Sequence, residues 1–110
     1  MKLIFSYLYR DAGNFKNFAS VVLSNTQQRP LAELEQALRT KLIDGLYFNA
    51  AQVNLPSVFF DDYDDDLDHD WHEFVSIELA DVTVLEVPER DISSLIQDLV
   101  KVPAGANSWF

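Results

Sequence analysis

Eight carboxylates are crowded into residues 61–73, and no lysine or arginine lies between Lys41 and Arg90 to neutralise them. Like charges at this density destabilise a compact chain through mutual repulsion, unless a cation or a basic partner relieves them. Aspartate is depleted in strands and is a mediocre helix former, so such a run belongs in a turn between two strands. We therefore expect this acidic segment (Asp61–Glu73) to connect two strands at the surface.

The chain is nevertheless hydrophobic enough to fold. Of its 110 residues, 48% are hydrophobic, which is far too many for a disordered acidic tail. The length suits one domain. We predict a single compact domain over residues 1–110, with the acidic segment at 61–73 and a C-terminal tail at 102–110.

The charge is unevenly placed along the sequence. Residues 42–89 carry thirteen acidic and no basic residues, whereas the rest of the chain carries eight basic and five acidic ones. A surface of this kind attracts a basic protein or a divalent cation, and it repels the phosphates of nucleic acid and of anionic lipid. The predicted partner is therefore a basic protein, with no nucleic acid and no membrane.

The N-terminus gives no targeting signal. Its apolar stretch reaches Ser6 and then Arg10 too soon for a signal peptide, and no stretch has the roughly twenty apolar residues of a membrane helix. The absence of cysteine excludes disulfides and thiolate metal sites. Cytoplasmic localisation is the default expectation.

Hydrophobic periodicity predicts an α+β fold, namely an antiparallel sheet in β-β-α-β-β-β-α order with two helices packed on one face. Strands are expected over 2–10, 15–24, 57–60, 75–79 and 82–87, with a single helical turn over 49–55 capped by Asn49. The first helix is expected over 30–43 and the second after Asp91, which is placed as its N-cap. Apolar side chains at helical spacing define the first helix: Leu31, Leu34, Leu38 and Leu42.

Alternation assigns faces to two of the strands. Val75, Ile77 and Leu79 are expected together on the buried face of their strand. Both faces of the first strand are apolar, so its Phe5-Tyr7-Tyr9 stripe is either core or the surface of a homodimer. The core interpretation is the stronger one, because large exposed apolar patches are rare on monomers.

The acidic segment can be interpreted as a solvated surface loop or as a metal-binding site. A solvated loop is the simplest. Alternatively, five carboxylates match positions 1, 3, 5, 9 and 12 of a calcium loop of the EF-hand type: Asp62, Asp64, Asp66, Asp70 and Glu73. Leu67 stands where that loop needs glycine, and strands are expected where it needs helices. A zinc site at His69 and His72 is a weaker idea, and we interpret both histidines as surface residues whose pKa is raised by neighbouring carboxylates.

The third interpretation, which we prefer as a function, is a protein-recognition surface. Aromatic side chains lie among the acids, where rings supply contact area while carboxylates steer a basic partner. In size and charge the chain resembles the small acidic proteins that neutralise basic enzymes, such as nuclease immunity and anti-restriction proteins. That resemblance covers no motif. The candidate partner-binding residues are Asp61, Asp62, Tyr63, Asp64, Asp65, Asp66, Asp68, Asp70 and Trp71.

Catalytic patterns are missing from the sequence. There is no cysteine nucleophile and no Gly-x-Ser-x-Gly turn, and three isolated glycines cannot form a phosphate-binding loop. A dense exposed run of carboxylates is also a poor site for acid–base chemistry, which needs a shaped, partly buried pocket. We expect neither an enzyme nor a bound cofactor.

Overall fold

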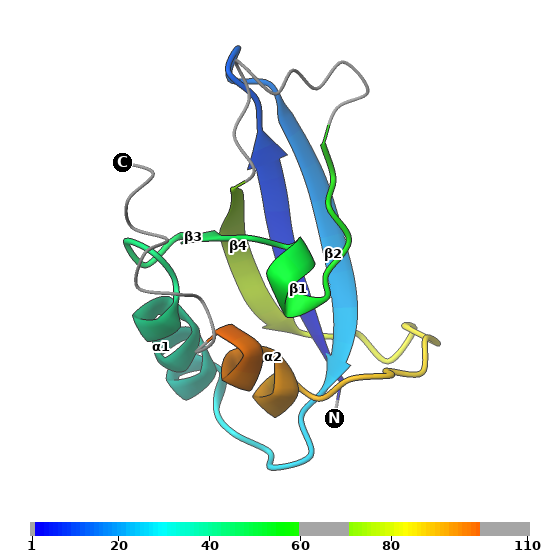
Figure 1. Ribbon diagram of the computed structural model, residues 1–110. Coiled ribbons are helices and arrows are strands. Elements are labelled where there is room, and N and C mark those ends of the chain that lie inside the picture. The colour runs from blue at the N-terminus through cyan, green and yellow to red at the C-terminus, as the bar shows by residue number, and fades with distance from the viewer. Residues whose placement is uncertain (1, 60–70, 100–110) are drawn as a thin grey trace.

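Four antiparallel strands and two helices make up the parts of the chain that the computed structural model describes, residues 2–59 and 71–99 (Figure 1). The strands lie in the order β2-β1-β4-β3. The elements along the chain are β1 (Lys2–Arg10), β2 (Lys16–Ser24), α1 (Leu31–Lys41), β3 (Tyr47–Phe48), a 3₁₀ turn (Ala51–Val53), β4 (His72–Leu79) and α2 (Ile92–Leu99). The predicted α+β class and antiparallel sheet are confirmed.

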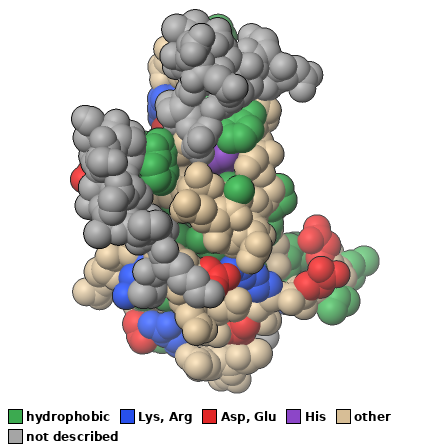
Figure 2. All heavy atoms as spheres, in the orientation of Figure 1, with side chains coloured by type: hydrophobic (Ala, Val, Ile, Leu, Met, Phe, Trp, Pro, Cys, Tyr) green, Lys and Arg blue, Asp and Glu red, His purple; other side chains and the backbone are tan. Residues whose placement is uncertain are grey.

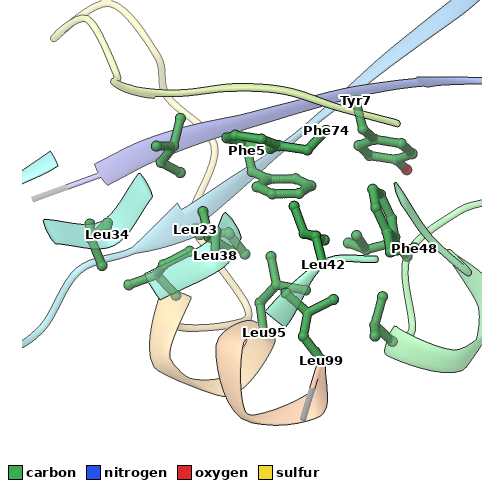
Figure 3. Close-up of a cluster of buried hydrophobic side chains, with 14 of the residues drawn as sticks. Phe5, Tyr7, Leu23, Leu34, Leu38, Leu42, Phe48, Phe74, Leu95 and Leu99 are labelled. Carbon is green, nitrogen blue, oxygen red and sulfur yellow. The ribbon is translucent and has the colours of Figure 1, made fainter. Parts of the chain in front are cut away.

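The core lies between one face of the sheet and the two helices. On the central strand β1, Leu3, Phe5 and Tyr7 are at most 1% exposed and belong to one cluster with leucines of α1 and α2. Figure 3 shows these rings above the leucines of the helices. We call this the inner face of the sheet and the opposite one the open face.

The Phe5-Tyr7-Tyr9 stripe is therefore core. Tyr7 and Tyr9 are fully buried, and the Phe5 ring lies 5.4 Å from that of Phe74 on β4, centroid to centroid. A homodimer built on this stripe is excluded, because all three of its side chains are at most 1% exposed within one chain.

α1 forms where its leucine spacing predicts. Leu34 and Leu38 are fully buried, and Leu42 follows as the C-cap residue. Gly45 then takes φ +70°, a left-handed conformation that suits glycine at a helix end. Neither helix of the described residues is long and apolar enough to cross a membrane.

An irregularity in β4 changes which of its residues face the core. The pairing of β1 with β4 shifts by one residue between Ser6 and Tyr7, which leaves Val75 as the extra residue. Because side chains alternate along a strand, a one-residue shift reverses the faces. Phe74 and Ile77 are both buried as a result, whereas Val75 is 40% and Leu79 is 54% exposed. The expectation that Val75, Ile77 and Leu79 are buried together is wrong. Only Ile77 of the three is buried: Val75 is displaced by the shift, and Leu79, although opposite Leu3 on the inner face, lies at the exposed end of the strand.

The predicted order of strands is wrong in its second half. Residues 57–59 are not a strand, and residue 60 lies outside the described residues. Residues 82–87 are also irregular, with Val82, Leu85 and Val87 at least 82% exposed. The two-residue strand β3 was not anticipated. The predicted turn over 49–55 is present in part, with Gln52 N donating to Asn49 Oδ1 (3.2 Å) before the chain turns at Asn54. The predicted tail, 102–110, falls outside the described residues.

Candidate functional site

Most of the acidic segment lies outside the described residues. The described residues on either side of that gap are Phe59 and Trp71. Both residues are half-buried. Trp71 is the member of the candidate partner-binding set that the structure describes. The other members lie outside the described residues: Asp61, Asp62, Tyr63, Asp64, Asp65, Asp66, Asp68 and Asp70.

His72, near the C-terminal end of the acidic segment, contacts the residues that precede the segment, Val58 and Phe59. It is fully buried, and its Nε2 accepts a hydrogen bond from Val58 N at 3.0 Å. The Phe59 ring centroid lies 5.3 Å from that of His72. Residues fourteen positions apart are thereby held together at one point on the sheet.

The interpretation of His72 as a surface residue is wrong, for a reason that lies in β4. After the register shift, His72 pairs with Tyr9 and points to the inner face, among the rings of Tyr7, Tyr9 and Phe48. An Nε2 that accepts a hydrogen bond carries no proton, so the imidazole is neutral with its proton on Nδ1. This histidine serves as a structural acceptor.

Two further hydrogen bonds hold the chain that leads into the acidic segment. Tyr7 Oη donates to Pro56 O at 2.7 Å, and Asn17 Nδ2 donates to Val58 O at 3.0 Å. Burial raises the pKa of the Tyr7 phenol, which keeps it protonated as a donor. Since Tyr7 lies on β1 and Asn17 on β2, two strands fix the position of residues 56–58.

On the other border, Glu73 is held on the open face by Arg10. The guanidinium donates from Nε to Oε2 at 2.8 Å and from a second nitrogen to Oε1 at 3.2 Å. Glu73 is only 8% exposed, and this hydrogen bond raises the pKa of Arg10. A two-pronged pair of this kind fixes both side chains in one geometry.

These contacts oppose the metal-binding interpretations. Glu73, the twelfth-position ligand of the calcium-loop match, already holds Arg10 with both oxygens. The Nε2 of His72 accepts a hydrogen bond from Val58 N, so this nitrogen is not available to a zinc ion. Within residues 2–59 and 71–99, no group of three or more potential ligands is placed to hold a metal ion.

The arginines of the chain are each paired with a described carboxylate. Three of the pairs lie on the helices or next to them, where Figure 2 shows blue and red side chains side by side. The four pairs are Arg10–Glu73, Arg29–Glu33, Arg39–Glu35 and Arg90–Asp98. Within the described residues, each guanidinium group thus has a carboxylate partner.

Comparison of the chain with protein families, with curated proteins and with solved structures finds no match.

Proposed function

We propose that the protein is a small acidic interaction domain that binds a basic protein through the acidic segment. The observation that carries the proposal is the charge balance. The chain carries eighteen acidic against eight basic residues, and residues 42–89 contain no lysine or arginine at all. Positive charge from outside the chain is therefore the natural complement of Asp61–Asp70.

The anchoring at His72 supports the same proposal. A segment whose two borders are fixed presents its charges with less freedom than a terminal tail, so a partner that binds it loses less conformational entropy. Trp71, half-buried beside these charges, supplies an aromatic surface for contact. The proposed mechanism is occlusion: carboxylates draw the basic partner in, and Trp71 with Tyr63 adds contact area.

The test compares two variants with the same net charge. One neutralises five carboxylates within the acidic segment, and the other neutralises five exposed carboxylates elsewhere in residues 42–89. The first is D61N/D62N/D64N/D65N/D66N. The matched control is D44N/E78Q/D81N/E86Q/E89Q, all of it exposed in the described structure.

Each protein is immobilised and used to capture proteins from a native lysate, and the captured partner is then purified for association kinetics at several salt concentrations. We expect capture of a basic protein by the wild type and by the control. Neutralising the acidic segment should slow association by about tenfold or more and flatten its dependence on salt. Equal losses in the two variants would show that net charge alone acts, and the proposal would be wrong.

A further inference from the structure

β2 is an edge of the sheet, and among the described residues its outward backbone groups pair only at Ser24. Ala80 N donates to Lys2 O on the β4 side of β1, and Ser24 N donates to Arg90 O on the outer side of β2, both at 3.0 Å. Because N–H and C=O directions alternate along an antiparallel strand, the even-numbered residues of β2 point their backbone groups outward. The Ser24–Arg90 bond belongs to a parallel bridge between Ser24 and Asp91, so residues 90–91 already lie along the edge beside Ser24.

The middle of this edge, residues 17–23, has none of the usual protection against further pairing. Sheet edges in natural proteins are commonly interrupted by proline, a bulge or inward-pointing charges. β2 pairs with β1 in unbroken register over nine residues, and Lys16 at its start is its single charged residue. Phe18 is 62% exposed. Residues 20–23 border an open groove of about 640 Å³, so there is space beside this part of the strand. Other walls of the groove are formed by residues 54–56 and by Glu86, Val87, Glu89 and Arg90.

Charge identifies a second copy of this chain as the occupant. Two molecules of net charge −10 repel each other over most of their surface. Residues 12–32, which include all of β2, contain no acidic residue and two basic ones. A contact between two β2 strands therefore places no carboxylate against another.

We propose that two copies pair β2 with β2 in antiparallel orientation, about a twofold axis at Ser20, to form one continuous sheet. In this register Phe18 lies opposite Val22 of the second copy on the open face, and such aromatic–β-branched pairs stabilise sheets. Ser20 lies opposite its own counterpart, in a pair that exchanges both backbone hydrogen bonds.

The antiparallel orientation also separates the two His72 residues. His72 is level with Tyr9 and Asn17, near the hairpin end of the sheet. With Ser20 on the axis, the Asn17 levels of the two copies are about 20 Å apart along the strands, at about 3.4 Å per residue. That distance exceeds two Debye lengths of about 8 Å at physiological salt, so charges held at these two levels are largely screened from each other.

Cross-linking tests the register directly, because the chain has no native cysteine. In the variant Ser20→Cys, the two thiols meet across the axis, with Cα atoms about 5.5 Å apart, which a disulfide or a short thiol cross-linker spans. The control is Gln36→Cys, on the exposed side of α1, which packs against β4 rather than β2. We expect rapid covalent dimer formation for the Ser20 variant alone. Equal rates for the two variants would overturn the proposal.

Sedimentation equilibrium tests the association without cysteines. The wild type should form a dimer as its concentration rises. Phe18→Lys, which sets a cation beside the axis on each copy, should raise the dissociation constant of the dimer by about tenfold or more. The matched control is Leu79→Lys, at a similarly exposed position (54%) on β4, which should leave the dimer intact. A wild type that stays monomeric at all concentrations, or a dimer that Phe18→Lys does not weaken, would overturn the proposal.

Discussion

The side chain of Asp91 links the end of β2 to the start of α2. Replacing Asp91 by alanine should therefore lower the stability of the fold substantially. One carboxylate oxygen accepts hydrogen bonds from Ser24 Oγ (2.8 Å) and Thr26 N (2.9 Å). The other accepts from Ser93 N (3.0 Å) and Ser93 Oγ (2.6 Å). A single side chain thus caps the helix and fixes the chain that leaves the sheet.

The magnitude follows from what alanine removes. Loss of a helix N-cap costs about 1 kcal/mol. Each bond from Ser24 and Thr26 to the charged group adds about 1 kcal/mol or slightly more, so we expect a loss of about 3 kcal/mol in the free energy of unfolding. For a domain of this size, that corresponds to a fall of roughly 12 °C or more in Tm. Urea unfolding followed by circular dichroism at several pH values measures it.

The contribution of Asp91 to the free energy of unfolding should also depend on pH. Burial raises the pKa of Asp91, but the hydrogen bonds from Ser93, Thr26 and Ser24 outweigh it and hold the pKa well below its usual range. A depressed pKa stabilises the fold at pH values above the unfolded pKa of about 3.9 and loses that contribution as the pH falls through the folded value. The stability gap between wild type and Asp91→Ala should therefore be constant near neutrality and shrink below about pH 4.

Asp81→Ala is the matched control. Asp81 also accepts a backbone hydrogen bond, from Thr83 N at 2.9 Å, and that bond lowers its pKa. It lies in an exposed turn that joins no other element, so its loss should be much smaller. If Asp91→Ala cost less than about 1 kcal/mol, or if the gap stayed constant in acid, the hydrogen bonds of Asp91 would not have the role assigned here.

Three further substitutions probe the core and the backbone by urea unfolding. His72→Phe keeps a ring but removes the acceptor for Val58 N, so stability should fall by about 1–3 kcal/mol and the Val58 amide should exchange faster; unchanged exchange would contradict the hydrogen bond. Leu38→Ala empties a fully buried site and should cost about 2–5 kcal/mol, whereas a loss below about 1 kcal/mol would place Leu38 outside the core. Gly45→Ala places a Cβ at φ +70° and should cost about 1 kcal/mol, so a stabilised variant would contradict that conformation.

Where a local pattern agrees with its tertiary surroundings, the sequence predicts the structure well. The leucine stripe of α1 buries Leu34 and Leu38, which its spacing selects, and the first hairpin keeps an unbroken register over nine pairs. The cap at Asp91 is also recognisable from sequence, because aspartate before an apolar helical run satisfies free N–H groups. All three features depend on residues close together in the chain.

The sequence predictions fail where pairing between residues far apart in the chain determines the structure. The extra residue at Val75 cannot be located from alternation alone, because a bulge depends on the partner strand. It carries His72 into the core and leaves Glu73 facing Arg10, so the anchor of the candidate site was missed. The one available signal is that Phe74 and Ile77, three positions apart, are both large and apolar. Residues 82–87 have β-forming composition, but they pair with no strand among the described residues.

The same long-range pairing governs the order in which the nascent chain can assemble. β1 obtains its first neighbour, β2, as soon as residue 24 is made, but its second neighbour ends at residue 79, where Leu79 pairs with Leu3. At about 5–20 residues per second, a ribosome needs roughly 3–11 s to synthesise the residues between those points. Throughout that interval, the edge of β1 that will pair with β4 has no partner strand. The growing polypeptide therefore depends on its surroundings to prevent premature pairing of β1 with another strand.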